Sequence, residues 1–317
     1  MKYGLIGKRL GYSYSQTIHE FLMKRAPAFQ EGSYHLLEMP DLSFPQGYGG
    51  FNITNPYKNR SLVEECLCSS GYERKDAFSE SGASGERDTA IEATSLFCGL
   101  LTDGEKARAC YREIVSHAVN TVSISGRYAV MHNTDIFGFC YSFSAMIKEA
   151  EEVCVLGTGS TSRMVRILMH YLGIPTQVVG RESVSALRTL SAGKSAVRLL
   201  VNCTPIGTAG YPDRLSGIGI DRASLQKFGF VADLTYNPEE TELISLARES
   251  GLVAKSGLEM LVAQALTAQM IWNGVSIGDY GIEKDRMTDE TLDMLRYNIR
   301  GKNKNETRNR TENGNKN

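Results

Sequence analysis

The chain has 317 residues, of which 42% are apolar, so it is long enough for two globular domains with hydrophobic cores. Lysine and arginine total 35 against 36 for aspartate and glutamate, which argues against nucleic acid or an anionic membrane as the main partner. Seven cysteines without CxxC spacing and five histidines without ligand-like spacing predict neither a disulfide framework nor a metal site, and favour a cytoplasmic location.

The first half of the chain alternates strand and helix patterns. YGLIG near the N-terminus predicts a strand, and no apolar stretch predicts a signal region or a membrane span. A helix is expected from about Gln16, with Ser15 as its N-cap. SYHLLEM and GGFNIT predict further strands, and TVSISGRYAVMHN predicts two strands around a Ser-Gly-Arg turn.

The segment from Cys66 to Arg112 fits this pattern poorly. It is rich in Gly, Ser and Glu, and we expect a helix in it only around Thr89 to Leu101. A connection of this length is uncommon inside a compact domain. We interpret residues 66–112 as an insertion, and we favour a lengthened surface loop over a lid or an oligomer contact.

From about Glu151 the pattern becomes a βαβ series. The predicted strands are VCVLG, TQVVG, RLLVNC and FVADL, and a helix from about Ser160 to Tyr171 joins the first two. Such apolar strands separated by helices predict a parallel sheet covered on both faces. A long apolar helix is expected from Leu258 to Trp272, and residues 301–317 are too polar to order themselves and predict a disordered tail.

The strand VCVLG runs into GTGSTS and then into a helix. Gly157 permits a tight turn, and Gly159 lets the backbone approach a pyrophosphate at the helix N-terminus. This context favours dinucleotide binding over a plain β–α turn. Ser162 stands where the usual fingerprint has Gly or Ala, and we expect it to loosen the packing slightly. The predicted phosphate-binding residues are Gly157, Thr158, Gly159, Ser160 and Thr161.

The strand TQVVG is followed by Arg181 and Glu182. An arginine at the end of this strand accommodates the 2′-phosphate of NADP, whereas an acidic residue favours NAD. Arg181 therefore favours NADP, although Glu182 would repel the phosphate and NAD stays possible. The alternative is that Arg181 is a solvated turn residue.

Several polar residues stand where a hydrophobic core would not place them. Ser13 and Ser15 precede a helix, where hydroxyls and free N–H groups can bind a carboxylate. Asn120 comes just before a strand, and Asp135 lies where the first half gives way to the second, the position of a cleft. Lys58 follows an Asn-Pro turn and is either an ordinary surface lysine or a fixed ammonium in that cleft.

Seven segments of the chain, in order and over nearly its whole length, resemble signatures of the shikimate dehydrogenase family. GKRLGYSYSQTIHE is similar to the family's paired-serine segment, FNITNPYK to Asn-Val-Thr-x-Pro-x-Lys, and AVNT and NTDIFGF to two further signatures. NCTPIGT is similar to Asn-x-Thr-Pro-x-Gly, DLTYNPEET to Asp-x-x-Tyr-x-Pro-x-x-Thr, and GLEMLVAQA to Gly-x-x-Met-Leu-x-x-Gln.

The resemblance implies an α/β fold of two domains with a cleft between them. A substrate-binding domain would comprise residues 1–132 and 258–300, and a Rossmann-type NAD(P)-binding domain residues 133–257. The implied reaction is the reversible NADP-dependent reduction of 3-dehydroshikimate to shikimate, in the pathway to aromatic amino acids. We expect a small-molecule substrate and a monomer or homodimer.

The resemblance also implies roles for individual residues. Lys58 and Asp135 match the catalytic pair, in which the ammonium donates a proton to the oxygen that gains charge as hydride arrives. No metal is expected, because the ammonium polarises the ketone. The residues implied to bind the substrate are Ser13, Ser15, Thr54, Lys58, Asn120, Asp135, Tyr236 and Gln264. Those implied to lie near the cofactor, beyond the glycine loop, are Arg181, Thr204, Pro205, Gly257 and Met260.

The chain departs from the family's pattern at three places. Tyr12 replaces a common histidine, Glu182 and Ser185 stand in the adenosine-side motif, and the spacing from Lys58 to Asn120 is long. The nearest alternative is therefore a quinate/shikimate dehydrogenase that uses NAD. A non-catalytic nucleotide-sensing protein is a rival of another class, but it would be expected to lose the lysine or the aspartate. A related dehydrogenase with a folate-like substrate would not need the serine pair or Gln264.

Overall fold

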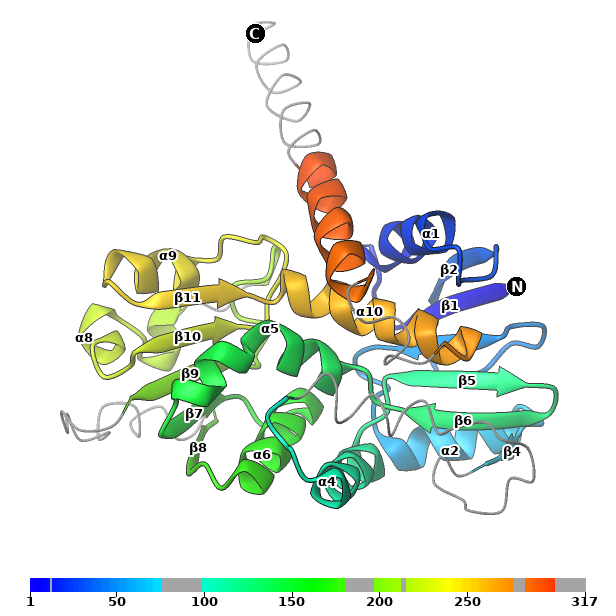
Figure 1. Cartoon of the computed structure of the whole chain (residues 1–317), viewed down its shortest axis with the longest axis horizontal. Helices are drawn as coiled ribbons and strands as arrows, with labels where there is room; N and C mark the ends of the chain where they lie inside the picture. Colours follow the sequence, from blue (N-terminus) through cyan, green and yellow to red (C-terminus); the bar gives the residue numbers. More distant parts are fainter. Residues whose placement is uncertain (12, 76–98, 181–196, 212–214, 276–282, 300–317) are drawn as a thin grey trace, which may run out of the picture.

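The computed structural model describes residues 1–11, 13–75, 99–180, 197–211, 215–275 and 283–299. Within these ranges the strands form two sheets, one of six strands and one of five. The sheets lie toward opposite ends of the molecule, with the helices α5 (Asp135–Glu149) and α10 (Leu258–Asn273) near the middle (Figure 1). The predicted tail, residues 301–317, lies outside the described residues.

The six-stranded sheet has the order β2-β1-β3-β5-β6-β4. β1 pairs in parallel with β2 and β3, whereas β5 pairs antiparallel with β3 and β6. Gly126, at φ +58°, lies in the turn between β5 and β6, where the left-handed conformation favours glycine. The five strands predicted here are confirmed, with the bounds β1 Lys2–Gly7, β2 Ser33–Glu38, β3 Gly50–Ile53, β5 Thr121–Ser125 and β6 Tyr128–His132. The short strand β4, Glu73–Arg74, was not predicted.

The described residues of this part of the chain include the helices α1 (Ser15–Arg25), α2 (Arg60–Ser69) and α4 (Gly104–His117). The prediction that Ser15 caps α1 is wrong, because the N-cap is Tyr14 and Ser15 is the first helical residue. The side-chain acceptor at this end of α1 is Ser13, the residue before the N-cap, and its hydroxyl accepts a hydrogen bond from Ser15 N at 3.2 Å.

The expectation that residues 66–112 form a helix only around 89–101 is wrong for the described part of the segment, whereas its interpretation as an insertion stays a prediction. α2 continues to Ser69, β4 pairs with β6, and α4 begins at Gly104. Residues 89–98 of the expected helix lie outside the described residues, and residues 99–101 are not helical. The signal for α4 was present in the sequence, because Asp103 is an N-cap that accepts from Glu105 N and Lys106 N. The buried face of α4 has helical spacing: Ala107, Cys110, Tyr111, Ile114 and Val115.

The five-stranded sheet is parallel throughout and has the order β11-β10-β9-β7-β8. Counted along this part of the chain, the order is 2-1-3-4-5, so the direction of winding switches at β7. Ligands of such sheets bind beyond the carboxyl ends of the strands at this switch point, which here is the start of the glycine loop. The bounds are β7 Glu152–Leu156, β8 Thr176–Val179, β9 Arg198–Asn202, β10 Phe230–Asp233 and β11 Val253–Ser256.

The α/β fold class, the four predicted strands of this sheet and the helix after the first of them are confirmed. β9 is buried at every position, as expected of a sheet with two covered faces. β11 was not predicted, because Val253–Ser256 is short and half polar. The helical segments of this part are α6 Ser160–Leu172, the 3₁₀ turn η2 Leu215–Ile218, α8 Arg222–Leu225 and α9 Glu242–Glu249.

Gly138 sets the close approach of α5 and α10. A Cβ added to Gly138 would lie 2.5 Å from the Met260 carbonyl oxygen and 3.1 Å from Gln264 N. α10 also packs on α1 and β5, and Trp272 Nε1 donates to Val122 O at 3.0 Å. α10 is therefore anchored to the six-stranded sheet along one side and to α5 along the other.

Residues 283–299 form a further helix that the sequence patterns did not predict. It is tied to α1 by the Arg25–Glu290 ion pair, to α5 by a hydrogen bond from Tyr141 to Asp285, and to the loop after β10 by Arg296 and Glu239. Across the described part of the chain, the helices lack the length and apolar character needed to cross a bilayer.

Candidate functional site

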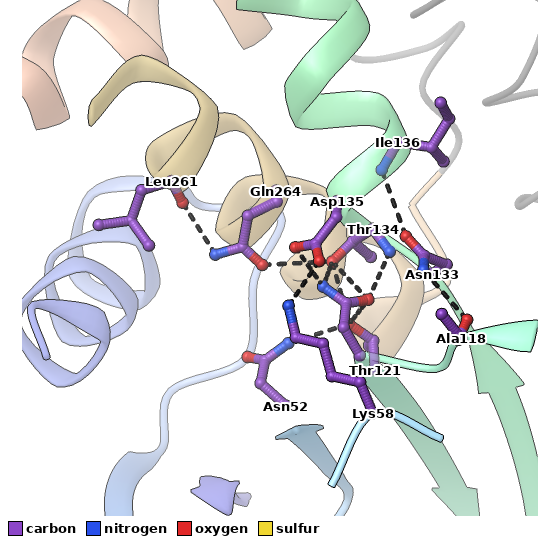
Figure 2. A network of polar contacts seen from close by, with 11 residues as sticks. Asn52, Lys58, Ala118, Thr121, Asn133, Thr134, Asp135, Ile136, Leu261 and Gln264 are labelled. Carbon is purple, nitrogen blue, oxygen red and sulfur yellow. Dashed lines mark hydrogen bonds and ion pairs between the residues drawn. The ribbon is translucent and has the colours of Figure 1, made fainter. Parts of the chain in front are cut away.

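Lys58 and Asp135 lie far apart in the sequence but form an ion pair, with Lys58 Nζ 2.6 Å from Asp135 Oδ2 (Figure 2). The turn before Lys58 is closed by a hydrogen bond from Tyr57 N to Thr54 O at 3.0 Å, and Val119 N donates to Lys58 O at 2.9 Å. The side chains of Lys58 and Asp135 are 15% and 11% exposed, so the pair is shielded from bulk water but remains accessible. Lys58 is therefore not an ordinary surface lysine.

Asn120 supplies the remaining hydrogen bonds that a largely buried ion pair needs. Its Nδ2 donates to Asp135 Oδ1 at 2.8 Å and to Thr134 Oγ1 at 3.0 Å, while its Oδ1 accepts from Thr134 N at 2.6 Å. Asp135 is the first residue of α5, where the positive end of the helix dipole also favours a carboxylate. Asp135 thus has both oxygens occupied and a fixed orientation.

Gln264 reaches the same cluster from α10. Its Oε1 accepts from Thr134 Oγ1 at 3.3 Å, and its Nε2 donates to Leu261 O at 2.8 Å (Figure 2). The close crossing at Gly138 permits this, because any larger residue there would push α10 away from α5. Four of the predicted substrate-binding residues therefore come together in one cluster: Lys58, Asn120, Asp135 and Gln264.

The sequence patterns missed the polar residues that support this cluster from inside the six-stranded sheet. Thr121 Oγ1 donates to Asn120 Oδ1 at 3.1 Å, and Asn52 Nδ2 donates to Thr121 Oγ1 at 3.0 Å. Tyr34 OH in turn donates to Asn52 Oδ1 at 2.8 Å, and the His19 ring stacks on Tyr34 at 4.0 Å. The available signal was Asn52 itself, an amide in the middle of the fully buried strand β3.

Burial lowers the pKa values of two histidines near this cluster, His19 and His132. It lowers the pKa of His19 to about 3 and that of His132 to about 4, because the charged imidazolium loses its hydration. His132 ends β6, directly before the Asn133–Asp135 segment, and its backbone oxygen accepts from Asn120 N at 3.1 Å. Both rings are therefore neutral near pH 7.

Ser13, Ser15 and Thr54 lie on segments that flank the first strand. The Ser13 hydroxyl donates to Ser15 Oγ at 3.1 Å, so two hydroxyls converge at the start of α1. Thr54 N donates to Ile6 O at 2.9 Å, and a Cβ added to Gly7 would lie 2.6 Å from Thr54 Cγ2. Tyr236, from the loop after β10, approaches the serine pair through Tyr14, with ring centroids 5.9 Å apart.

The glycine loop has the geometry expected of a phosphate-binding turn. Gly157 has φ +100°, which residues with a side chain rarely adopt, and Gly159 is the N-cap of α6 with open space where a Cβ would lie. Thr158 is exposed, and Ser160 and Thr161 form the first turn of α6. The expectation that Ser162 loosens the packing is wrong, because its buried hydroxyl donates to Gly157 O at 2.6 Å and joins the helix to the loop.

A second polar cluster joins the loops after β9 and β10. Asp233 is fully buried and accepts from Asn202 Nδ2 at 2.9 Å, from Thr235 N at 3.1 Å and from Thr241 Oγ1 at 2.6 Å. Asn202 Oδ1 also accepts from Thr204 Oγ1 at 2.6 Å. Burial raises the pKa of Asp233, although these hydrogen bonds oppose the shift.

The remaining predicted cofactor residues lie on these loops or next to them. Thr204 and Pro205 follow β9, and Thr204 Cγ2 would be 3.1 Å from a Cβ on Gly157. Gly257 N donates to Thr235 O at 2.9 Å, and Met260 lies on the first turn of α10. The structure therefore brings the glycine loop close to the loop after β9. Arg181 lies outside the described residues.

No family model matches the chain. A curated relative from Chlorobium phaeovibrioides, named shikimate dehydrogenase (NADP(+)), is 28% identical over 300 residues, which cover 87% of this chain and 91% of that protein. A solved chorismate mutase/shikimate 5-dehydrogenase fusion protein from Clostridium acetobutylicum is similar with a TM-score of 0.63 at 27% identity, covering 95% and 98% of the two chains.

Shikimate 5-dehydrogenase from Thermus thermophilus, solved in complex with NADP(H) and shikimate, shares the fold with a TM-score of 0.60 at 21% identity. The similarity covers 92% of this chain and 99% of that one. Sequence and fold therefore agree over nearly the whole length, and the resemblance that the motifs predicted is confirmed: the chain is a relative of the shikimate dehydrogenases.

Proposed function

We propose that the protein is a shikimate dehydrogenase, which reversibly reduces 3-dehydroshikimate to shikimate with NADPH in the shikimate pathway of aromatic amino acid biosynthesis. The observation that carries the proposal is the Lys58–Asp135 ion pair at 2.6 Å, largely shielded from water and fixed by Asn120. The names of the relatives support the substrate and the cofactor. A non-catalytic nucleotide sensor would have no need to fix an ammonium in this way.

In the proposed mechanism Lys58 is the proton donor and acceptor. During reduction its ammonium donates a proton to the carbonyl oxygen that becomes the hydroxyl, and during oxidation the lysine takes that proton back. The nicotinamide of the bound cofactor supplies the hydride. Asp135 holds Lys58 Nζ through Oδ2 and Asn120 through Oδ1, so the ammonium is oriented before the substrate arrives.

The other residues of the cluster would orient the substrate ring. The hydroxyls of Ser13 and Ser15 converge at the N-terminus of α1, which suits a carboxylate. Asn120, Thr54 and Gln264 are polar side chains that can hold ring hydroxyls, as Asp135 can. We place Tyr236 beside the substrate carboxylate, because its ring contacts Tyr14 between the two serines.

The residues at the carboxyl end of β7 fit a dinucleotide. Gly159 leaves open space for a pyrophosphate, and the N-terminus of α6 supplies N–H donors through Ser160 and Thr161. Thr158, Thr204, Pro205, Gly257 and Met260 are the further residues that we propose for the cofactor site. Arg181 is proposed to bind the 2′-phosphate of NADP.

We further propose that residues 1–132 and 258–300 form the substrate-binding domain and residues 133–257 the nucleotide-binding domain. The contacts of α10 with α1 and β5 support the inclusion of the C-terminal helices in the first domain. A cytoplasmic location is proposed from the cysteine pattern. The assembly, a monomer or a homodimer, stays a prediction.

The test is shikimate-dependent reduction of NADP and of NAD by the purified protein, with Lys58→Ala and the control Lys148→Ala, an exposed lysine on α5. We expect turnover with NADP that falls by at least about 100-fold in Lys58→Ala, since general acid–base catalysis typically contributes this much. Lys148→Ala should match the wild type. Nucleotide binding without turnover would contradict the proposal, and comparable rates with NAD, or faster turnover of quinate, would favour the quinate/shikimate alternative.

A further inference from the structure

Tyr14 has a position that the proposed reaction does not use. It lies between Ser13 and Ser15 at the start of α1, and its ring centroid is 5.9 Å from that of Tyr236, with the planes tilted by 55°. Tyr236 follows β10, so the two rings come from segments that belong to different sheets. Their contact joins the two halves of the molecule at the chain segment that carries Ser13 and Ser15.

The backbone around Tyr236 is held on both sides of the ring. Thr235 N donates to the buried Asp233 at 3.1 Å, and Asn237 O accepts from Ala209 N at 2.9 Å. Glu239 accepts from Arg296 Nη2 at 2.7 Å, which ties the same loop to the helix of residues 283–299. The loop that carries Tyr236 is therefore held by hydrogen bonds on both sides of this residue.

The backbone around Tyr14 is held in the same way. Ser13 N donates to Leu10 O at 2.9 Å, Ser15 N donates to Ser13 Oγ at 3.2 Å, and Ile18 N donates to Tyr14 O at 3.0 Å. The Tyr14 ring is partly buried and packs against the hydrophobic core. The Tyr14 and Tyr236 rings in contact form a wall, and Ser13 and Ser15 flank Tyr14 in the chain.

We propose that Tyr14 determines specificity by making this wall, which admits a carboxylate on a trigonal ring carbon and excludes one on a tetrahedral carbon that bears a hydroxyl. The inference rests on the proposed function, in which the two serines bind the carboxylate. Shikimate has the trigonal carbon, because its carboxylate is conjugated with the ring double bond. Quinate has the tetrahedral carbon.

The discrimination follows from the shape of the two carbons. A trigonal carbon keeps its carboxylate and its ring neighbours in one plane, so it projects nothing toward a wall beside that plane. A tetrahedral carbon must project either the hydroxyl or the carboxylate out of the plane. With the serines fixing the carboxylate, the hydroxyl of quinate would meet the wall or lose its hydration there without a partner.

The experiment measures kcat/KM for shikimate and for quinate with NADP in the wild type, Tyr14→Ala, Tyr14→Leu and Tyr14→Phe. We expect Tyr14→Ala and Tyr14→Leu to raise the quinate/shikimate ratio by about tenfold or more, the scale of steric selection in an enzyme pocket. Tyr14→Phe should keep the wild-type ratio, because the ring and not its hydroxyl makes the wall. Tyr128→Ala, at the β5–β6 turn and 36% exposed, is the control.

An unchanged ratio in folded Tyr14→Ala and Tyr14→Leu would overturn the inference, even if both activities fell together. A wild type that already prefers quinate would overturn it as well. A wild type that oxidises neither shikimate nor quinate would instead contradict the proposed function as an enzyme, and no ratio could then be measured. Tyr14→Leu keeps apolar volume in the core, so it tests the idea if Tyr14→Ala does not fold.

Discussion

Two buried aspartates in this molecule have different surroundings. Asp135 faces an ammonium, Lys58 Nζ at 2.6 Å, and its side chain is 11% exposed. Asp233 is fully buried and is bound by neutral donors from Asn202, Thr235 and Thr241. The first arrangement keeps a charge beside an accessible space, where it can serve chemistry, whereas the second uses both oxygens to hold two loops together. Burial alone therefore does not identify a functional carboxylate. The charge of its partner and its remaining exposure to solvent distinguish the two aspartates.

The largest effect is expected from Asp135→Asn. The amide keeps the shape of the carboxylate but removes the charge that holds Lys58, so we expect kcat for shikimate oxidation to fall by about 100- to 1,000-fold. The melting temperature should fall as well, because an amide that accepts from Asn120 turns its NH2 group toward Lys58 Nζ and leaves this largely buried ammonium without a charge partner. Steady-state rates and thermal unfolding monitored together would check this. A variant with wild-type kcat would remove the distinction between the two aspartates.

The second prediction concerns Gly138, which brings Gln264 to the Asp135 cluster. In Gly138→Ala the new Cβ would lie 2.5 Å from the Met260 carbonyl oxygen, so α5 and α10 must separate. We expect the free energy of unfolding to fall by about 1–3 kcal/mol, as in other overpacked contacts. Urea denaturation would measure it. Gly104→Ala is the matched control, because the atom nearest to its new Cβ is the end of the Arg108 side chain, 3.7 Å away.

The third prediction uses the histidine beside the Asp135 cluster. The folded-state pKa of His132 is lowered to about 4 from 6.5, so the unfolded chain takes up a proton between these values before the folded protein does. Stability from this group is full above about pH 6.5 and is lost as the pH falls toward 4, by roughly 3 kcal/mol in all. His132→Gln should flatten the loss of stability with acid, measured as the free energy of unfolding between pH 7 and pH 4.

A second buried histidine adds to the loss of stability in acid that His132 causes, and an exposed histidine provides a control. His19 is also buried, and its pKa of about 3 adds a loss of stability over an overlapping and more acidic range. His132→Gln should therefore leave a residual slope. His170 is exposed near the end of α6, and His170→Gln should leave the slope of the wild type unchanged. An equal slope in His132→Gln and the wild type would show that the imidazole is not the group that titrates.

The sequence alone predicted much of the fold and the charged part of the site. Strand and helix periodicity gave both sheets, because local apolar patterns are set by burial on one or two faces. Lys58, Asn120, Asp135 and Gln264 stood out as polar residues in motifs and do come together. The helix α4 within residues 66–112 was not predicted, because the polar composition of the segment outweighed a cap at Asp103 and a helical apolar pattern after it.

The residues that support the site could not be predicted in the same way. Asn52 and Thr121 meet because β3 and β5 pair antiparallel, which places Asn52 opposite Thr121. This register depends on the whole sheet and leaves no local signal. Tyr14 and Tyr236 likewise meet only once the two halves of the chain pack together. Contacts between residues that are distant in the sequence are fixed by tertiary packing. Sequence patterns therefore identify candidate site residues but not the residues that they contact.

The smallest effect is expected from Asp233→Asn, the same chemical change as in the first prediction. The amide oxygen can still accept from Thr235 N and Asn202, and the Thr241 hydroxyl can turn to accept from the new amide. We therefore expect kcat within about threefold of the wild type and a free energy of unfolding within about 1 kcal/mol at neutral pH. Asp233→Ala is the matched contrast, because it leaves the buried donors without an acceptor and should cost about 1–3 kcal/mol.

The dependence on pH distinguishes Asp233 from Asp135 further. Burial raises the folded-state pKa of Asp233 above the ordinary value of 3.8, so the folded protein holds this proton more tightly than the unfolded chain does. The stability that this carboxyl contributes is present below 3.8 and is lost as the pH rises through the raised folded-state pKa. Asp233→Asn cannot lose a proton, so its stability relative to the wild type should increase as the pH rises across that range. A relative stability that falls instead would mean that the charge of Asp233 stabilises the fold, and that the two aspartates are more alike than their partners suggest.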